Sequence, residues 1–139
     1  MAITNAFPTQ SKLDALSALC PSGNVYKAVL LTSTATFDAT ATTYNGTGEV
    51  AAGNGYTTGG QTLTGYVASI DSGVAILDFN DPSWPSSSIS AAGMLIVDTT
   101  NGNKIRGVYS FGQTVTSTNG TFTATLPAPA AATAVIRIA

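Results

Sequence analysis

The chain has 139 residues, of which only 9% are charged, and five Lys or Arg against seven Asp or Glu give a formal net charge of −2. This length is typical of one domain, and so weakly charged a surface attracts nucleic acid little, which excludes a DNA- or RNA-binding role. The absence of histidine removes the commonest general base and metal ligand, and a single cysteine leaves neither a zinc site nor an internal disulfide.

The first 24 residues are expected to form an arm and a short helix. Residues 1–10 show no regular periodicity, and Pro8 suits the first turn of a helix. Leucines recur at every third position within residues 11–20, which predicts a helix that ends at Pro21. We expect this helix to lie on the sheets of a β domain that spans residues 25–139.

No membrane or export signal is visible in the sequence. Residues 1–10 lack the basic start and apolar run of a secretory signal. No stretch approaches the roughly 18 apolar residues of a membrane-spanning helix. We therefore expect no membrane partner.

The pattern changes to β at residue 25. Residues 25–32 form an apolar run of strand length. The tract that follows, residues 33–60, is rich in Thr, Gly and Ala, and its glycines disfavour a helix. We expect an extended excursion with one short strand near Glu49–Ala51, and so long a loop is often functional. Residues 61–70 are predicted to form the next strand.

The stretch from Val74 to Phe111 organises the rest of the domain. Val74–Phe79 is apolar on both faces, so we expect it to be covered on both sides. The turn residues 71–73 predict a hairpin between this strand and the one before it. Pro82 and Pro85 then bracket the only tryptophan, which predicts a rigid loop or an edge strand.

The second half of that stretch predicts another hairpin. The apolar run Met94–Val97 predicts a buried strand, and residues 98–103 contain the Asn and Gly that are typical of a tight turn. Ile105 to Phe111 alternates apolar and polar residues, so the return strand should be half buried.

The C-terminal part contains one more turn signal and a closing strand. Asn119-Gly120, between residues 115–118 and 121–126, predicts a hairpin. Residues 134–138 close the chain, with Arg137 opposite its apolar neighbours. About eight strands and short turns predict an all-β fold, as a two-sheet antiparallel sandwich or a barrel.

The residues that could carry chemistry have simpler structural interpretations. Asp78 and Asp81 could form the carboxylate pair of a glycosidase, but Asp is common where a strand enters a turn. Residues 98–103 could bind calcium through oxygen atoms, although hairpin geometry explains them. Cys20 is expected to be a buried apolar residue. We predict no enzymatic activity, no metal site and no cofactor.

Contact with other proteins is the better supported role. Trp84 is either a sugar platform or interface anchor, or a core residue held by its two prolines. Arg137 is either solvated or paired with a carboxylate across a subunit boundary. We expect the N-terminal arm and the glycine-rich tract to be the main contact elements. The candidate contact residues are Phe7, Pro8, Tyr44, Tyr56, Trp84 and Arg137.

Three blocks in fixed order resemble small virion proteins of tailed bacteriophages: Leu30–Gly65, Ala75–Trp84 and the closing Ala134–Ala139. The role associated with this pattern is that of a capsid cement, or decoration, protein. The resemblance implies a jelly-roll fold, no enzymatic activity and a homodimer on the outer surface of the head. The implied partner is the major capsid protein, and the implied place of synthesis is the host bacterial cytoplasm. The alternative is a receptor- or carbohydrate-binding module of a head or tail fibre, with Trp84, Tyr44 and Tyr56 as its platform.

Overall fold

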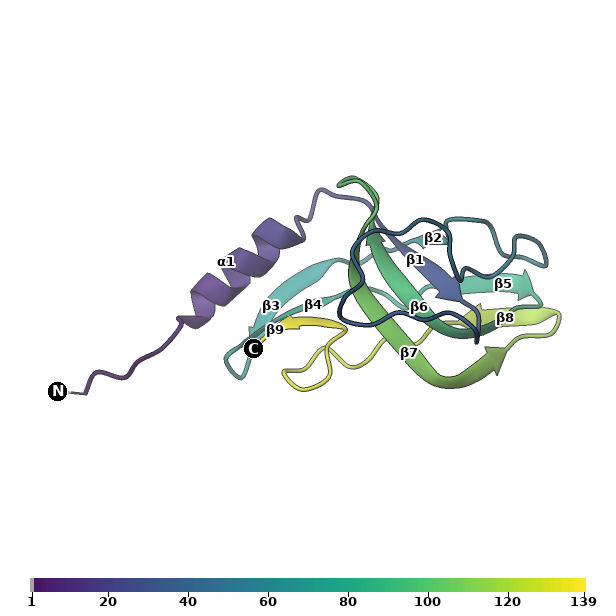
Figure 1. The fold of residues 1–139 in the computed structure, drawn as a ribbon. Coiled ribbons are helices and arrows are strands. Elements are labelled where there is room, and N and C mark those ends of the chain that lie inside the picture. Colours follow the sequence, from purple (N-terminus) through teal and green to yellow (C-terminus); the bar gives the residue numbers. More distant parts are fainter. Residues whose placement is uncertain (1) are drawn as a thin grey trace.

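The computed structural model describes residues 2–139, which are mostly β with one short helix (Figure 1). The predicted all-β class is confirmed. In chain order the elements are α1 (Thr9–Leu19), β1 (Tyr26–Leu31), β2 (Gln61–Thr62), β3 (Val67–Asp71), β4 (Val74–Asp78), β5 (Ser83–Ser87), β6 (Ser90–Asp98), β7 (Lys104–Thr116), β8 (Gly120–Thr123) and β9 (Ile136–Ile138).

The strands form three antiparallel sheets where the sequence predicted two. Their orders are β2-β1-β6-β7, β3-β4-β9 and β5-β8. Alternate residues of β1 and β6 face the main apolar cluster, which also takes side chains from α1 and from both smaller sheets. This arrangement is consistent with a β sandwich in which the four-stranded sheet covers the other two.

The helix α1 matches the predicted segment, shifted slightly toward the N-terminus. It packs against β3, β4 and β9, and it buries Leu16 and, just after its end, Cys20. Leu19, which the leucine spacing placed on the buried side, is 46% exposed. The buried residues are four apart, so the contact stripe follows the 3.6-residue period rather than every third residue.

Two predicted hairpins are confirmed. β3 and β4 pair from Asp71↔Val74 onward, and both turn residues, Ser72 and Gly73, have positive φ, as this tight turn requires. β4 is buried on both faces, as expected. β6 and β7 pair on either side of residues 99–103.

The β6–β7 hairpin contains a bulge that the alternation pattern did not predict. Ile96 pairs with Gly107 but Val97 pairs with Ile105, so Arg106 is an extra residue on β7. An extra residue reverses the faces of the strand beyond it. Ile105 consequently packs on the second apolar cluster, on the opposite face of the sheet from Tyr109.

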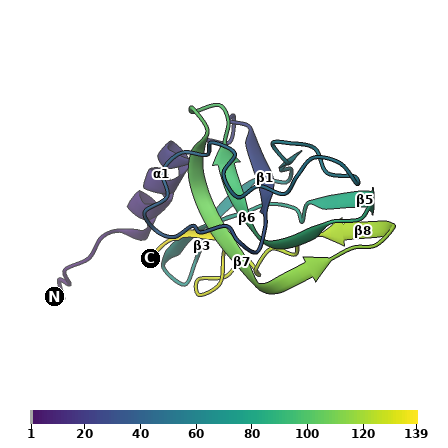
Figure 2. The same cartoon turned by 45° about the vertical axis from the view of Figure 1, so that its right-hand side comes forward.

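The predicted Asn119-Gly120 hairpin is wrong. β8 pairs with β5, while β7 continues along β6 as far as Ser90↔Thr116. The two strand pairs form one long ribbon that bends between the sheets, and the strands lie side by side in both views (Figure 1 and Figure 2). At the bend, Ser117 N donates to Ile89 O at 2.8 Å and Ile89 N donates to Ser117 Oγ at 3.0 Å.

The prediction of one continuous strand over residues 61–70 is also wrong, because the segment forms two separate strands. Its first part is β2, which pairs with β1, and its second part is β3, which pairs with β4. Gly65 lies between them with φ of 71°. A Cβ at this position would lie 2.5 Å from the Asn80 side chain, so the chain changes sheets at a place where only glycine fits.

The glycine-rich tract covers the outer face of the four-stranded sheet. Ala35, Phe37 and Tyr44 pack on a second cluster formed by Val29, Leu31, Leu95 and Val97. The strand expected near Glu49–Ala51 is reduced to one isolated bridge between Leu31 and Glu49. The tract is therefore a structural cover as well as a surface loop.

Candidate interaction surfaces

The N-terminal arm, residues 2–8, is the most exposed part of the described chain. It has no regular structure and leaves the body at one end (Figure 1 and Figure 2). Ile3 is 81% exposed and Phe7 59% exposed. Phe7 and Pro8 thus lie on the surface where a partner can reach them. Ile3 was not among the predicted contact residues, although an isolated apolar residue in an irregular segment was a usable signal.

The base of the arm is fixed to the body. Lys12 Nζ donates to Gly73 O at 2.9 Å, at the β3–β4 turn. A Cβ on Gly73 would lie 3.7 Å from Thr9 Cγ2, so the first turn of α1 rests on this turn. The arm consequently leaves the body from a defined place, next to the end of the β3-β4-β9 sheet.

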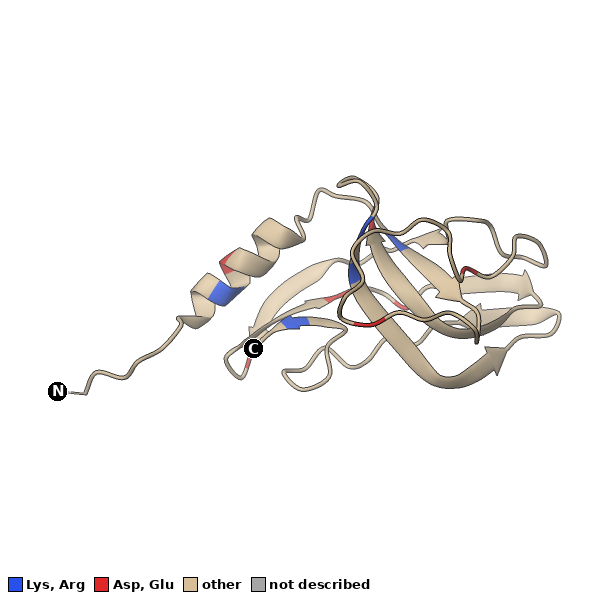
Figure 3. Cartoon of the chain, in the orientation of Figure 1, with Lys and Arg blue, Asp and Glu red and all other residues tan. Residues whose placement is uncertain are grey.

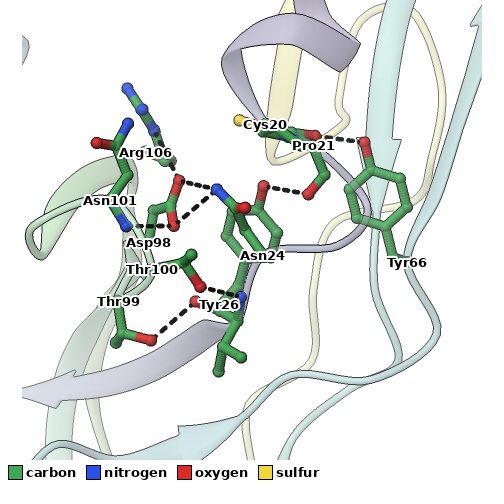
Figure 4. A network of polar contacts seen from close by, with 11 residues as sticks. Cys20, Pro21, Asn24, Tyr26, Tyr66, Asp98, Thr99, Thr100, Asn101 and Arg106 are labelled. Carbon is green, nitrogen blue, oxygen red and sulfur yellow. Dashed lines mark hydrogen bonds and ion pairs between the residues drawn. The ribbon is translucent and has the colours of Figure 1, made fainter.

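A buried carboxylate holds the segment between α1 and β1 (Figure 4). Asp98 is 0% exposed, and its two oxygens accept hydrogen bonds from Asn24 Nδ2 at 3.2 and 3.0 Å. Asn101 N donates to the same side chain at 3.2 Å. Arg106 Nε lies 3.6 Å from it and has no hydrogen-bond partner of its own. The hairpin tip and the α1–β1 connection therefore share one buried acceptor.

Two tyrosines complete this connection. Tyr26 OH donates to Pro21 O at 2.7 Å, and Tyr66 OH donates to Cys20 O at 2.5 Å. Burial raises the pKa of the Cys20 thiol, in keeping with its predicted role as a small apolar residue. The end of α1 is thus tied to two sheets, which sets the direction of the helix and of the arm before it.

Glu49 organises the glycine-rich tract, a role that no pattern in the sequence predicted. Its carboxylate accepts hydrogen bonds from the hydroxyls of Tyr44 and Tyr56 and from Gly59 N, the last two at 2.7 Å. Tyr56 OH in turn accepts from Leu30 N at 3.1 Å. The two tyrosines therefore join the tract to β1.

These contacts predict a loss of stability at alkaline pH. Burial, together with the hydrogen bonds to Glu49, raises the pKa of Tyr44 and Tyr56 above the ordinary value of 10.0, and burial does the same for Tyr26. The folded chain then holds protons that the unfolded chain releases. The stability that these tyrosines contribute should be fully present below about pH 10 and be lost as the pH rises above it, and the buried Cys20 thiol acts in the same direction from about pH 9.

Urea unfolding measured between about pH 8 and pH 11 checks this prediction. A Glu49→Gln variant should keep most of the dependence, because burial is the first cause of the shifts. A free energy of unfolding that stays flat through this range would contradict the account.

The prediction that Trp84 and Tyr56 are exposed contact residues is wrong. Trp84 is 5% exposed and Tyr56 3% exposed. The Trp84 ring lies 6.0 Å from the ring centroids of both Tyr56 and Phe122. The core interpretation of Trp84 is confirmed, and its segment is an edge strand, β5, paired only with β8. Tyr44 is half buried over the second cluster, so the three aromatic rings do not form a surface platform.

The two carboxylates weighed as a glycosidase pair do not share a site. Asp81 Oδ1 accepts a hydrogen bond from Leu126 N at 2.9 Å, and Asp81 borders a small pocket beside β2 that Asp78 does not line. Within residues 2–139, no group of three or more His, Cys, Asp or Glu is arranged to hold a metal ion. No helix in this part of the chain has the length and apolar character needed to cross a bilayer.

A cleft of about 680 Å³ lies between β7 and β9. Arg137 lines it from β9 with its side chain exposed, and Asp38 and Arg106 line it from other elements. Charged residues are otherwise sparse and scattered over the fold (Figure 3). Arg137 thus stands at the surface as predicted, beside a cleft that the sequence did not predict.

The structure leaves two candidate interaction surfaces, the N-terminal arm and the β7–β9 cleft. They come from distant parts of the chain, and both adjoin the β3-β4-β9 sheet. Comparison with known proteins identifies no relative: no family model, no curated protein and no solved structure matches this chain.

Proposed function

We propose that this chain is a non-catalytic structural protein of a tailed-phage head. In this role it is a cement, or decoration, protein that binds the outer surface of the capsid and bridges neighbouring major capsid subunits. The ordered resemblance of Leu30–Gly65, Ala75–Trp84 and Ala134–Ala139 to such virion proteins supports the assignment. The antiparallel β fold is compatible with it.

We further propose that the sandwich has jelly-roll topology. The ribbon of β5–β6 against β7–β8 supports this, because strands that bend and switch sheets form the corners of sandwich folds. The four-stranded sheet would be one layer, and the two smaller sheets together the other.

The observation that carries the proposal is the exposed apolar arm on a firmly anchored helix. Ile3 and Phe7 project from a body whose other large apolar side chains are mostly buried, and exposed apolar surface marks sites of association. A cement protein occupies many equivalent sites, so a modest contact at each site is enough to stabilise the assembled shell by mass action. Self-association into a dimer would let one unit reach two capsid neighbours.

Fractionation of the particle that carries this chain tests the proposal. The chain should be recovered with purified DNA-filled heads, in many copies, and be accessible to antibody on their outer surface. Recovery with tails alone would reject a cement role and favour the fibre alternative. A glycan-binding assay of the free chain is the companion measurement, and we expect no binding because the aromatic rings proposed as a platform are buried or half buried.

A further inference from the structure

The cleft between β7 and β9 is bordered by two free strand edges. β7 is the last strand of its sheet, and β9 is the last strand of another. Residues 42–44 cover only the start of β7, where Ile105 N donates to Thr42 O at 2.9 Å. From Arg106 onward, the outer edge of β7 makes no backbone hydrogen bond within residues 2–139. Free edges of this kind bind an added strand.

The cleft has a mixed lining of small, apolar and charged residues. Its walls include Ala39 and Ala41 from the glycine-rich tract, and Val135 and Ile136 from the β9 side. A Cβ on Gly107 would lie 3.5 Å from Ile136 Cγ1, so the Ile136 side chain packs directly on β7 at this glycine. A segment that enters this cleft meets the free backbone edge of β7, small and apolar side chains, and the three charged side chains described above.

The N-terminal arm has the properties of such a segment. Residues 2–8 carry no charged side chain, so none would be buried without a partner. Ile3 and Phe7 are four residues apart, which places them on the same face of an extended strand, while Thr4 and Ala6 lie on the other. Pro8 has no N–H and would end the added strand before α1 begins.

We propose that the β7–β9 cleft is the docking site for the arm, residues 2–8, of a second copy of this chain. Each copy gives its arm to the other and receives one in return. Ile3 and Phe7 of the arm lie in the cleft, and the arm backbone bonds to the free edge of β7. This inference deepens the proposed function, on whose self-association it rests, by naming the segment and the surface that join the two copies.

The position of the arm fits a reciprocal exchange. Its base rests on the β3–β4 turn, and β4 is the strand that pairs with β9, with Ala75 opposite Ile138. Arm base and cleft therefore adjoin the same sheet. An extended arm of this length spans about 23 Å at about 3.3 Å per residue. In a two-fold dimer the same patch faces itself, so both arms and both clefts are covered at once.

Sedimentation velocity of the full-length free chain over a range of concentrations tests the proposal. We expect a dimer. In an Ile3→Asp/Phe7→Asp variant the dimer dissociation constant should rise at least about 100-fold, because four large apolar side chains lose their buried position. Thr4→Asp/Ala6→Asp is the matched control: it adds the same charge to the opposite face of the arm and should change the constant much less.

A complementation experiment then identifies the cleft as the receptor. Ala39→Trp fills the cleft from an exposed loop position, and circular dichroism verifies that the variant is folded. This variant and the Ile3→Asp/Phe7→Asp variant should each be monomeric alone, yet form a heterodimer when mixed, since one intact arm then meets one intact cleft.

Three results would overturn the inference: a monomeric wild-type chain, a dimer that survives the arm variant, or mixed variants that stay apart. None of them bears on whether the chain is found on phage heads, so failure here is distinguishable from failure of the proposed function. If the arm variant instead loses only its binding to assembled shells, the arm contacts the capsid protein and the exchange is rejected.

Discussion

Trp84→Ala should lower the free energy of unfolding by about 3–5 kcal/mol, the usual cost of removing a large aromatic side chain from a core. Trp84 is 5% exposed and packs between Tyr56 and Phe122. Its removal leaves a cavity between the β5–β8 sheet and the glycine-rich tract, which Glu49 holds in place. Neither the sheet nor the tract can move freely to fill this cavity. Urea unfolding followed by far-ultraviolet circular dichroism gives the value.

Lys104→Ala provides the surface control, because its exposed side chain lies outside the β7–β9 cleft and forms no ion pair with another residue of the described chain. We expect its effect to stay within about 0.5 kcal/mol. If Trp84→Ala is as mild as this control and also abolishes binding to a glycan, Trp84 is a platform and the core interpretation fails.

Asp98→Ala should have an effect of similar size, about 3–5 kcal/mol, since it leaves a charged partner without its counter-ion in a buried position. Arg106 is only 13% exposed, and its Nε has no hydrogen-bond partner to replace the carboxylate. Asn24 and Asn101 lose their acceptor in the same substitution. The α1–β1 connection should therefore loosen as the domain loses stability.

Asp38→Ala is the matched control, because this aspartate is exposed and binds only Thr40, two residues away. A double variant, Asp98→Leu/Arg106→Met, should be less destabilised than Asp98→Ala, as both charges leave together. Equal unfolding curves for wild type and Asp98→Ala would show that the buried carboxylate does not hold this connection.

Local patterns in the sequence predicted the strands but not always their partners. The apolar run Val74–Phe79 and the turn before it were sufficient to place β4 and its hairpin, since all the interactions are local. Asn119-Gly120 is an equally strong turn signal, yet the strands on either side of it pair with β6 and β5. That outcome depends on the bend at Ile89 and Ser117, a contact between residues 28 apart that no local pattern contains.

The same limit applies to the candidate contact residues. The sequence correctly placed Phe7, Pro8 and Arg137 at the surface, because irregular or alternating segments expose such positions. It could not separate buried from exposed aromatic residues in the glycine-rich tract, where no period exists. Tyr56 is buried against Trp84 with its hydroxyl bound to Glu49, and this packing becomes visible only when the tract folds back on β1.

Electron cryomicroscopy of the particle that carries this chain is the most direct measurement of its role. The account predicts compact β-rich density repeated at equivalent sites over the outer face of an icosahedral shell, each copy contacting more than one capsid subunit. Density confined to the tail or a fibre, with a bare shell, would contradict it.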